Sequence, residues 1–246
     1  AKTLSQISTG KKENKFGVNE KTFYEIIDYC KNSKNIDLNC LSVHIGSQIL
    51  DHKPYEKMLK VVDNILKKTS HEFEYIDLGG GMGISYTDNN KKLNYKKYNL
   101  AIKKFLKNKK CKIIFEPGRS IIGNAGTLIT KVIYIKDSES KKFIILDAAM
   151  NDLMRPALYG ATHKTLPVIK SGNISRKIYE FVGPICESTD KFLTIKNFQE
   201  LHEKDYIAIC DVGAYGMSLS SNYNLRTKPL EILIKNNKIK IIRKRQ

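Results

Sequence analysis

The sequence predicts an α/β protein in which a parallel sheet is followed by a second, β-rich part. Up to about residue 120, strand-like apolar runs alternate with segments of helical periodicity over short connections. Beyond that point strand patterns follow one another and helical patterns become rare. We therefore expect two closely packed domains, residues 1–120 and 121–246, because no low-complexity linker separates them.

The elements of the first part follow from its apolar spacing. Helical spacing predicts helices over residues 20–34, 54–67 and 95–107. Apolar runs that end near glycine or a Pro-Gly turn predict strands at 38–45, 75–78 and 113–115. Strands joined through helices pair in parallel, so an α/β layer or barrel of about four strand–helix units is expected. Further strands are expected at 128–135, 143–146, 178–181, 206–210 and 230–234.

Composition narrows the class of protein. The chain has 246 residues, is 41% hydrophobic and carries a net charge of +18. Only six of its 43 basic residues are arginine and no aromatic–basic interleaving occurs, which disfavours nucleic acid as a partner. We find no apolar run of about 18 residues and no signal peptide, so no membrane span or secretion is expected. Five cysteines without a C-x-x-C pair indicate no metal site and a reducing, cytoplasmic location.

Polar groups follow three consecutive strands of the first part. His44 and Ser47 follow the first strand, glycines from Gly79 to Gly83 the second, and Glu116-Pro117-Gly118-Arg119 the third. The carboxyl ends of parallel strands form the edge where α/β proteins bind ligands. The sequence therefore predicts a ligand site at this edge.

Each of these groups also has a purely structural interpretation. His44 alone is better explained as a hydrogen-bonded core histidine, and the glycines alone as a tight turn. Following a strand and beside Ser47, the glycines favour phosphate, because without Cβ atoms they let backbone N–H groups approach it. Glu116 and Arg119 could form a salt bridge, but opposite charges in a Pro-Gly turn favour a charged ring nitrogen and an anion as partners.

The second part holds three further candidate groups. Arg155 and Tyr159 stand four residues apart and would share one face of a helical turn, suited to a carboxylate and an amine. Cys186 and Glu187 lie in a polar turn segment, where a thiol could transfer a proton and a carboxylate could hold a cation. Tyr215, between two glycines, could donate to a phosphate, or be a packed turn tyrosine.

The order of these motifs resembles that of the diaminopimelate decarboxylases, which are fold-type III pyridoxal-phosphate (PLP) decarboxylases. The resemblance begins at residues 7–17, covers nearly the whole chain and is most specific at Gly-Pro-Ile-Cys-Glu-Ser-Thr-Asp. The other matching blocks are His-Ile-Gly-Ser-Gln (44–48), Gly-Gly-Gly-Met-Gly-Ile (79–84), Glu-Pro-Gly-Arg (116–119), Asn-Asp-Leu-Met-Arg-Pro-Ala-Leu-Tyr (151–159), Gly-Ala-Tyr-Gly (213–216) and Tyr-Asn-Leu-Arg-Thr-Lys-Pro (223–229).

The resemblance implies the C-terminal half of a (β/α)8 barrel followed by a β-rich domain, working as a homodimer with shared sites. It implies decarboxylation of meso-2,6-diaminopimelate to L-lysine, with Cys186 as the proton donor to the partner's site. Its cofactor-binding residues would be His44, Ser47, Gly79, Gly80, Gly81, Glu116, Pro117, Gly118, Arg119 and Tyr215. Its substrate-binding residues would be Arg119, Arg155, Tyr159, Glu187 and Tyr215.

One expected feature of that family has no counterpart in the sequence. None of the lysines stands in the strand context of the residue that binds the cofactor covalently. With about half a barrel and no initiator Met, the chain is expected to be a fragment that lacks the N-terminal part and is inactive alone. Two alternatives stay open: a PLP decarboxylase of another basic amino acid, and a catalytically dead homologue that binds a partner.

Overall fold

The computed structural model describes residues 15–87 and 91–245, which form two compact units. Unit 1 holds the described residues up to Ser85 and from Lys91 to Ile121, and unit 2 holds Tyr86, Thr87 and everything from Ile122 onward. Most of the 7–17 motif lies outside the described residues. No helix within the described ranges is long and apolar enough to cross a membrane.

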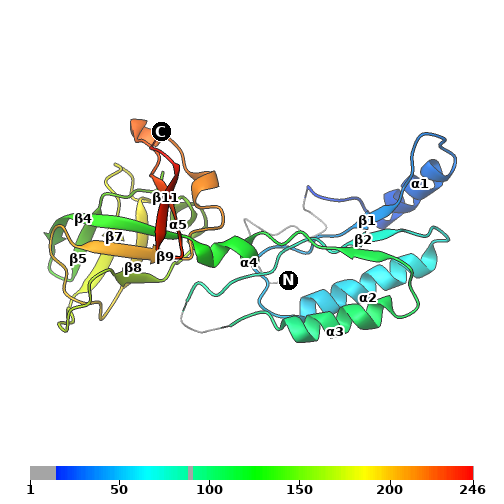
Figure 1. Ribbon diagram of the computed structural model, residues 1–246, viewed down its shortest axis with the longest axis horizontal. Coiled ribbons are helices and arrows are strands. Elements are labelled where there is room, and N and C mark those ends of the chain that lie inside the picture. Colours follow the sequence, from blue (N-terminus) through cyan, green and yellow to red (C-terminus); the bar gives the residue numbers. More distant parts are fainter. Residues whose placement is uncertain (1–14, 88–90, 246) are drawn as a thin grey trace. The chain divides into compact units, whose positions relative to one another are not determined.

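Unit 1 contains a three-stranded parallel sheet. Its strands are β1 (Cys40–Ser42), β2 (Tyr75–Asp77) and β3 (Lys112–Ile114), hydrogen-bonded in the order β1-β2-β3 (Figure 1). All three expected strands are confirmed; β1 and β2 are shorter than the expected runs, and β3 begins one residue earlier than expected. About four strand–helix units were expected. The described part of unit 1 holds three strands, and its first element is a helix with no strand before it.

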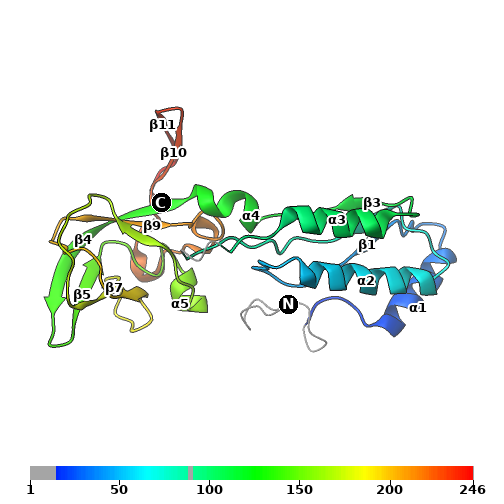
Figure 2. The same ribbon diagram turned by 90° about the horizontal axis from the view of Figure 1, so that it is seen from below.

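Three helices accompany this sheet, α1 (Glu20–Lys31), α2 (Lys53–Lys68) and α3 (Tyr95–Leu106). The asparagine before α1 and the one before α3 each accept a backbone N–H of the first turn, from Thr22 at 2.9 Å and from Lys97 at 3.0 Å. A proline in the first turn of α2 suits a helix start. Helices α2 and α3 lie side by side (Figure 2).

The core of unit 1 is tied directly to a strand end. Tyr55 of α2 is fully buried and stacks on Tyr98 of α3 with ring centroids 4.4 Å apart. Its hydroxyl donates to the carbonyl oxygen of Gly80 at 3.2 Å, and burial raises the pKa of that hydroxyl above its usual range. The packed helix layer therefore holds the glycine segment after β2 in place.

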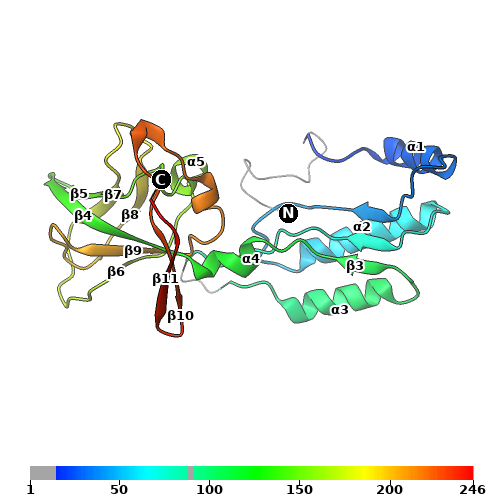
Figure 3. The ribbon, with the colours of Figure 1, turned by 45° about the horizontal axis from the view of Figure 1, so that its top comes forward.

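Unit 2 is built on a curled, six-stranded sheet in the order β6-β9-β4-β5-β7-β8, and its six strands are labelled in Figure 3. All neighbours pair antiparallel except β5 and β7, which run parallel. Its apolar core includes Ile144, Leu146, Phe181 and Ile207, all without exposed surface. The strands are β4 (Thr127–Asp137), β5 (Lys141–Leu146), β6 (Thr165–Pro167), β7 (Ile178–Val182), β8 (Lys191–Ile195) and β9 (Tyr206–Cys210).

Shorter elements complete the chain. α4 (Arg119–Ile122) and a 3-10 turn (Gly123–Ala125) precede β4, α5 (Arg155–Tyr159) follows β5, and 3-10 turns occupy Met217–Leu219 and Tyr223–Leu225. The hairpin of β10 (Glu231–Lys235) and β11 (Lys238–Arg243) pairs separately and projects from the six-stranded sheet (Figure 3). The expected β-rich second part is confirmed, and β6, β8 and β11 are strands that the sequence patterns did not predict.

Candidate functional site

The ends of the three parallel strands meet at one edge of unit 1. The Gly80 N–H donates to His44 Nδ1 at 3.4 Å, and the Glu116 N–H donates to the Gly79 carbonyl at 2.9 Å. A Cβ atom on Gly80 would lie only 2.2 Å from the Glu116 carbonyl oxygen. His44 and the Glu116 backbone therefore both contact the glycine segment that lies between them in the strand order.

The glycines after β2 are required by close packing as well as by backbone conformation. Gly79 and Gly81 have φ of 64° and 82°, in the left-handed region that side chains disfavour. A Cβ on Gly81 would lie 2.2 Å from the Gly46 carbonyl oxygen. The Gly79 N–H donates to Asp77 Oδ1 at 2.8 Å and the Gly80 N–H to His44. Of these three glycines, Gly81 is the one whose N–H donates to no acceptor among the described residues.

The remaining predicted groups of this edge differ in exposure. The His44 and Glu116 side chains are exposed, as are Pro117 and Gly118, whereas Ser47 is half-buried and Arg119 is buried. The edge therefore presents an imidazole ring, a carboxylate and a glycine-lined backbone. Gln48, for which the sequence predicted no role, binds both backbone groups of Ile84. Its Nε2 donates to the Ile84 carbonyl at 2.6 Å, and its Oε1 accepts the Ile84 N–H at 3.3 Å.

Arg155 lies at the start of α5 and is buried, with 4% of its surface exposed. Its Nη1 lies 2.8 Å from Nε2 of His163, and its guanidinium carbon lies 4.5 Å from the ring centroid of Tyr86. Tyr159, four residues on, is half-buried at the other end of the same helix. The predicted helical turn is present, and Arg155 is held from two sides.

The loop between β7 and β8 carries Cys186 and Glu187 on its outside. Buried Asp190 accepts the backbone N–H groups of Met150, at 2.7 Å, and of Ile185, at 2.8 Å. The Ile185 side chain points inward, while Cys186 and Glu187 are exposed. Burial raises the pKa of the Asp190 carboxyl. This anchor fixes the loop against the segment that leads into α5, so that the thiol and carboxylate face outward.

Two hydroxyl groups orient the Glu187 carboxylate. Tyr223 donates to Oε1 in a short hydrogen bond, and Thr189 donates to Oε2 at 3.2 Å. The bond to Glu187 raises the pKa of the Tyr223 hydroxyl. Arg226, three residues further, donates to Asn151 Oδ1 at 3.1 Å and to the Asp147 carbonyl at 2.5 Å. Tyr223 and Arg226 belong to a motif quoted from the sequence, but their roles in this network were not predicted.

The turn that carries Tyr215 is packed tightly on the chain before β4. A Cβ on Gly213 would lie 2.0 Å from the Ile122 carbonyl oxygen, and the Gly213 N–H donates to the Gly123 carbonyl at 3.1 Å. Tyr215 itself has φ of 63°, a conformation that costs about 1 kcal/mol outside glycine. Its side chain is 47% exposed. The turn thus presents a tyrosine from a constrained backbone.

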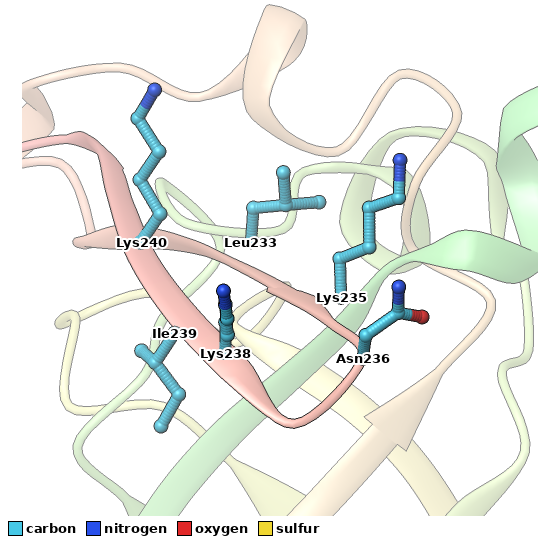
Figure 4. A pocket seen from close by; sticks show the side chains of 6 residues that line it. All are labelled: Leu233, Lys235, Asn236, Lys238, Ile239 and Lys240. Carbon is cyan, nitrogen blue, oxygen red and sulfur yellow. The ribbon is translucent and has the colours of Figure 1, made fainter.

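Two surface pockets lie on unit 2, and the lining of one of them includes Thr189, which donates to Glu187. One, of about 410 Å³, is lined only by residues of the β10–β11 hairpin (Figure 4), and the other, of about 320 Å³, lies between α5 and β8. Neither is lined by a predicted site residue. Among the described residues, no three His, Cys, Asp or Glu side chains are grouped to hold a metal ion.

Comparison with known proteins decides the family. A profile described as the C-terminal sheet domain of pyridoxal-dependent decarboxylases matches residues 18–213. The chain belongs to the pyridoxal-dependent decarboxylase family. The expected resemblance to this family is confirmed. The expected pyridoxal cofactor is confirmed at the level of the family.

Relatives within this family are similar over the whole chain. The diaminopimelate decarboxylase of Aquifex aeolicus is 41% identical over 100% of the chain and 59% of its own length. The crystal structure of diaminopimelate decarboxylase from Helicobacter pylori complexed with L-lysine superposes with a TM-score of 0.91, at 43% identity, over 100% of the chain and 61% of that protein. The chain therefore spans about three fifths of the length of these relatives.

A more distant structure shares the fold alone. The lysine/ornithine decarboxylase of Vibrio vulnificus complexed with cadaverine superposes with a TM-score of 0.78 at 21% identity, over 89% of the chain and 61% of that protein. Its identity to the chain is about half that of the Helicobacter pylori structure.

Proposed function

We propose that the chain is part of a meso-diaminopimelate decarboxylase, which converts meso-2,6-diaminopimelate to L-lysine and CO₂ with pyridoxal phosphate. The relatives quoted above carry that name, and the Helicobacter pylori enzyme was crystallised with L-lysine. Loss of CO₂ from one end of diaminopimelate leaves lysine, so the bound molecule in that relative is the product of the proposed reaction.

The observation that carries the proposal is a buried, oriented guanidinium in the same unit as an oriented carboxylate. The far end of diaminopimelate bears both a carboxylate and an ammonium group. Arg155 suits the carboxylate, because guanidinium binds carboxylate through parallel N–H donors. Glu187, held by Tyr223 and Thr189, suits the ammonium. Ornithine and arginine carry no carboxylate at the far end, so a site of this kind favours diaminopimelate. Further contacts to the substrate would come from Tyr159, Arg119 and Tyr215.

The edge of unit 1 fits a flat cofactor with a phosphate and a basic ring nitrogen. The exposed His44 ring would stack on it and the Glu116 carboxylate would face the nitrogen, with Pro117, Gly118 and Arg119 beside them. Ser47, the Gly81 N–H and Tyr215 would hold the phosphate. Gly79 and Gly80 would shape the backbone rather than donate, because their N–H groups are bound within the chain. When bound, pyridoxal phosphate supplies an electron sink for the charge left by departing CO₂.

The protein's own residues would then control protonation. Cys186, exposed on an anchored loop, would give its proton to the carbon that loses CO₂, and Glu187 would hold the substrate amine beside it. We further propose that residues 1–120 form part of a (β/α)8 barrel and that residues 121–246 contribute substrate-binding and dimer-interface groups. In that arrangement two copies form a homodimer, and the Cys186 loop of one completes the site of the other.

A cofactor-dependence experiment tests this proposal. Enzymes of this family bind the cofactor covalently through a lysine, and the three strand-end segments 43–48, 78–84 and 115–119 carry none. The assay therefore uses the full reading frame that encodes the chain. We expect CO₂ release from meso-diaminopimelate to disappear when pyridoxal phosphate is removed and to return when it is added back. Release that continues without pyridoxal phosphate would contradict the proposal, and cofactor binding without any CO₂ release would favour a catalytically dead homologue.

A further inference from the structure

His163 is buried beside Arg155 and is not among the residues proposed to touch cofactor or substrate. It precedes β6, where the Cys210 N–H donates to the Lys164 carbonyl at 2.8 Å and the Thr165 hydroxyl donates to the His163 carbonyl at 3.2 Å. The pairing of β6 with β9 therefore fixes the backbone of His163. Its imidazole lies between Arg155, eight residues earlier in the chain, and Cys210, 47 residues later.

Hydrogen bonding determines which nitrogen of His163 carries the proton. Nδ1 lies 2.9 Å from the Cys210 carbonyl oxygen, which can only accept, so Nδ1 must be the donor. Nε2 lies 2.8 Å from Arg155 Nη1, and a guanidinium can only donate, so Nε2 must accept. Both contacts are satisfied together by one species, the neutral imidazole with its proton on Nδ1.

Tyr86 completes the support of the guanidinium. Its ring lies 4.5 Å from the guanidinium carbon and 5.0 Å from the His163 ring, which it meets edge to face at 74°. An arginine side chain has many rotamers, and ordering it on binding weakens affinity. A hydrogen bond at one edge and an aromatic ring at one face restrict Arg155 before any substrate arrives.

We propose that His163 is a positioning residue, which orients the Arg155 guanidinium for the far carboxylate of the substrate. This inference rests on the proposed function, because it takes Arg155 as the carboxylate-binding group. In this proposal His163 acts through Arg155 and not on the reacting atoms. Its loss therefore weakens substrate binding more than it slows the chemical step.

Two substitutions separate this role from a purely structural one. In the full-length protein, His163→Gln keeps an amide oxygen near the position of Nε2, where it can accept from Arg155. His163→Asn keeps an amide N–H near the position of Nδ1, where it can donate to the Cys210 carbonyl. We expect His163→Asn to raise KM for meso-diaminopimelate about 10- to 100-fold, the range for losing a hydrogen bond to a charged group, with kcat changed less than about threefold. His163→Gln should keep KM within about threefold.

Melting temperature provides the contrasting readout. A purely structural role would make His163→Gln, which loses the bond to Cys210, the more damaging variant in both KM and melting temperature. The exposed His202 is the matched control, and His202→Asn and His202→Gln should leave both quantities unchanged. Equal KM values for His163→Asn and the parent would overturn the inference.

A spectroscopic measurement tests the geometry without any assay. In ¹⁵N-histidine-labelled full-length protein, the resonances lost in both His163 variants identify this side chain. We expect them to show a neutral ring with its proton on Nδ1, and a proton on Nε2 would overturn the inference. If this tautomer is found but meso-diaminopimelate is not decarboxylated, the proposed function fails while the Arg155–His163 arrangement stands.

Discussion

Replacing Cys186 by alanine in the full-length protein is expected to lower kcat for meso-diaminopimelate about 10²- to 10⁴-fold, the range for losing a positioned proton donor. The change removes the thiol without disturbing the loop, because the Asp190 carboxylate accepts the backbone N–H groups of Ile185 and Met150, and Ile185 provides the buried contact. Substrate and pyridoxal-phosphate affinities should change little.

The measurement is steady-state turnover combined with equilibrium binding of substrate and cofactor. Cys30→Ala, in α1 of unit 1, is the matched control and should retain parental turnover. Mixed dimers extend the test. Subunits with Cys186→Ala should regain activity when paired with subunits that lack the cofactor-binding lysine, since one of the two shared sites would then be intact. Hybrids that form but stay inactive would contradict a Cys186 that acts across the interface, and unchanged kcat in the variant would remove it from the reaction.

Replacing Glu116 by glutamine is expected to lower kcat about 10²-fold or more, while cofactor affinity changes far less. A carboxylate facing the ring nitrogen stabilises its protonated form, and a neutral amide of the same shape does not. The backbone of this residue is held independently of the side chain, through its N–H bond to the Gly79 carbonyl. The fold of the strand end should therefore survive the substitution.

Turnover with saturating pyridoxal phosphate, measured together with cofactor affinity, checks this prediction. Glu139→Gln, at an exposed position in the β4–β5 turn, changes the same functional group away from the site and should behave as the parent. A Glu116→Gln variant with parental kcat would show that Glu116 does not face the ring nitrogen.

Apolar periodicity predicted most of the fold. The helix expected at 54–67 is α2 (Lys53–Lys68), and the strand expected at 206–210 is β9 (Tyr206–Cys210). Strand β6 (Thr165–Pro167) is too short to give a periodic signal. Strand β11 (Lys238–Arg243) does alternate, but lysine occupies every second position at its start, so its apolar content is low for a strand. Charged residues fit there because the hairpin is exposed on both faces.

The contacts that build the site were less predictable than its residues. The meeting of His44, Gly80 and Glu116 follows from parallel pairing, since carboxyl ends of parallel strands share one edge. The Arg155–His163 pair depends on the register of β6 with β9, which no local pattern in the sequence encodes. The role of Asp77, which accepts the Gly79 N–H, was predictable from the sequence. An aspartate two residues before a run of glycines can accept a backbone N–H of the turn.

The most direct test of the central claim is the substrate preference of the full-length protein with pyridoxal phosphate. We predict that kcat/KM for meso-diaminopimelate exceeds that for L-lysine, L-ornithine and L-arginine by at least about 10³-fold, because a site built to bind a polar group discriminates strongly against analogues that lack it. All three competitors lack the far carboxylate that Arg155 is proposed to bind. A kcat/KM for L-ornithine or L-arginine equal to or above that for meso-diaminopimelate would contradict the claim.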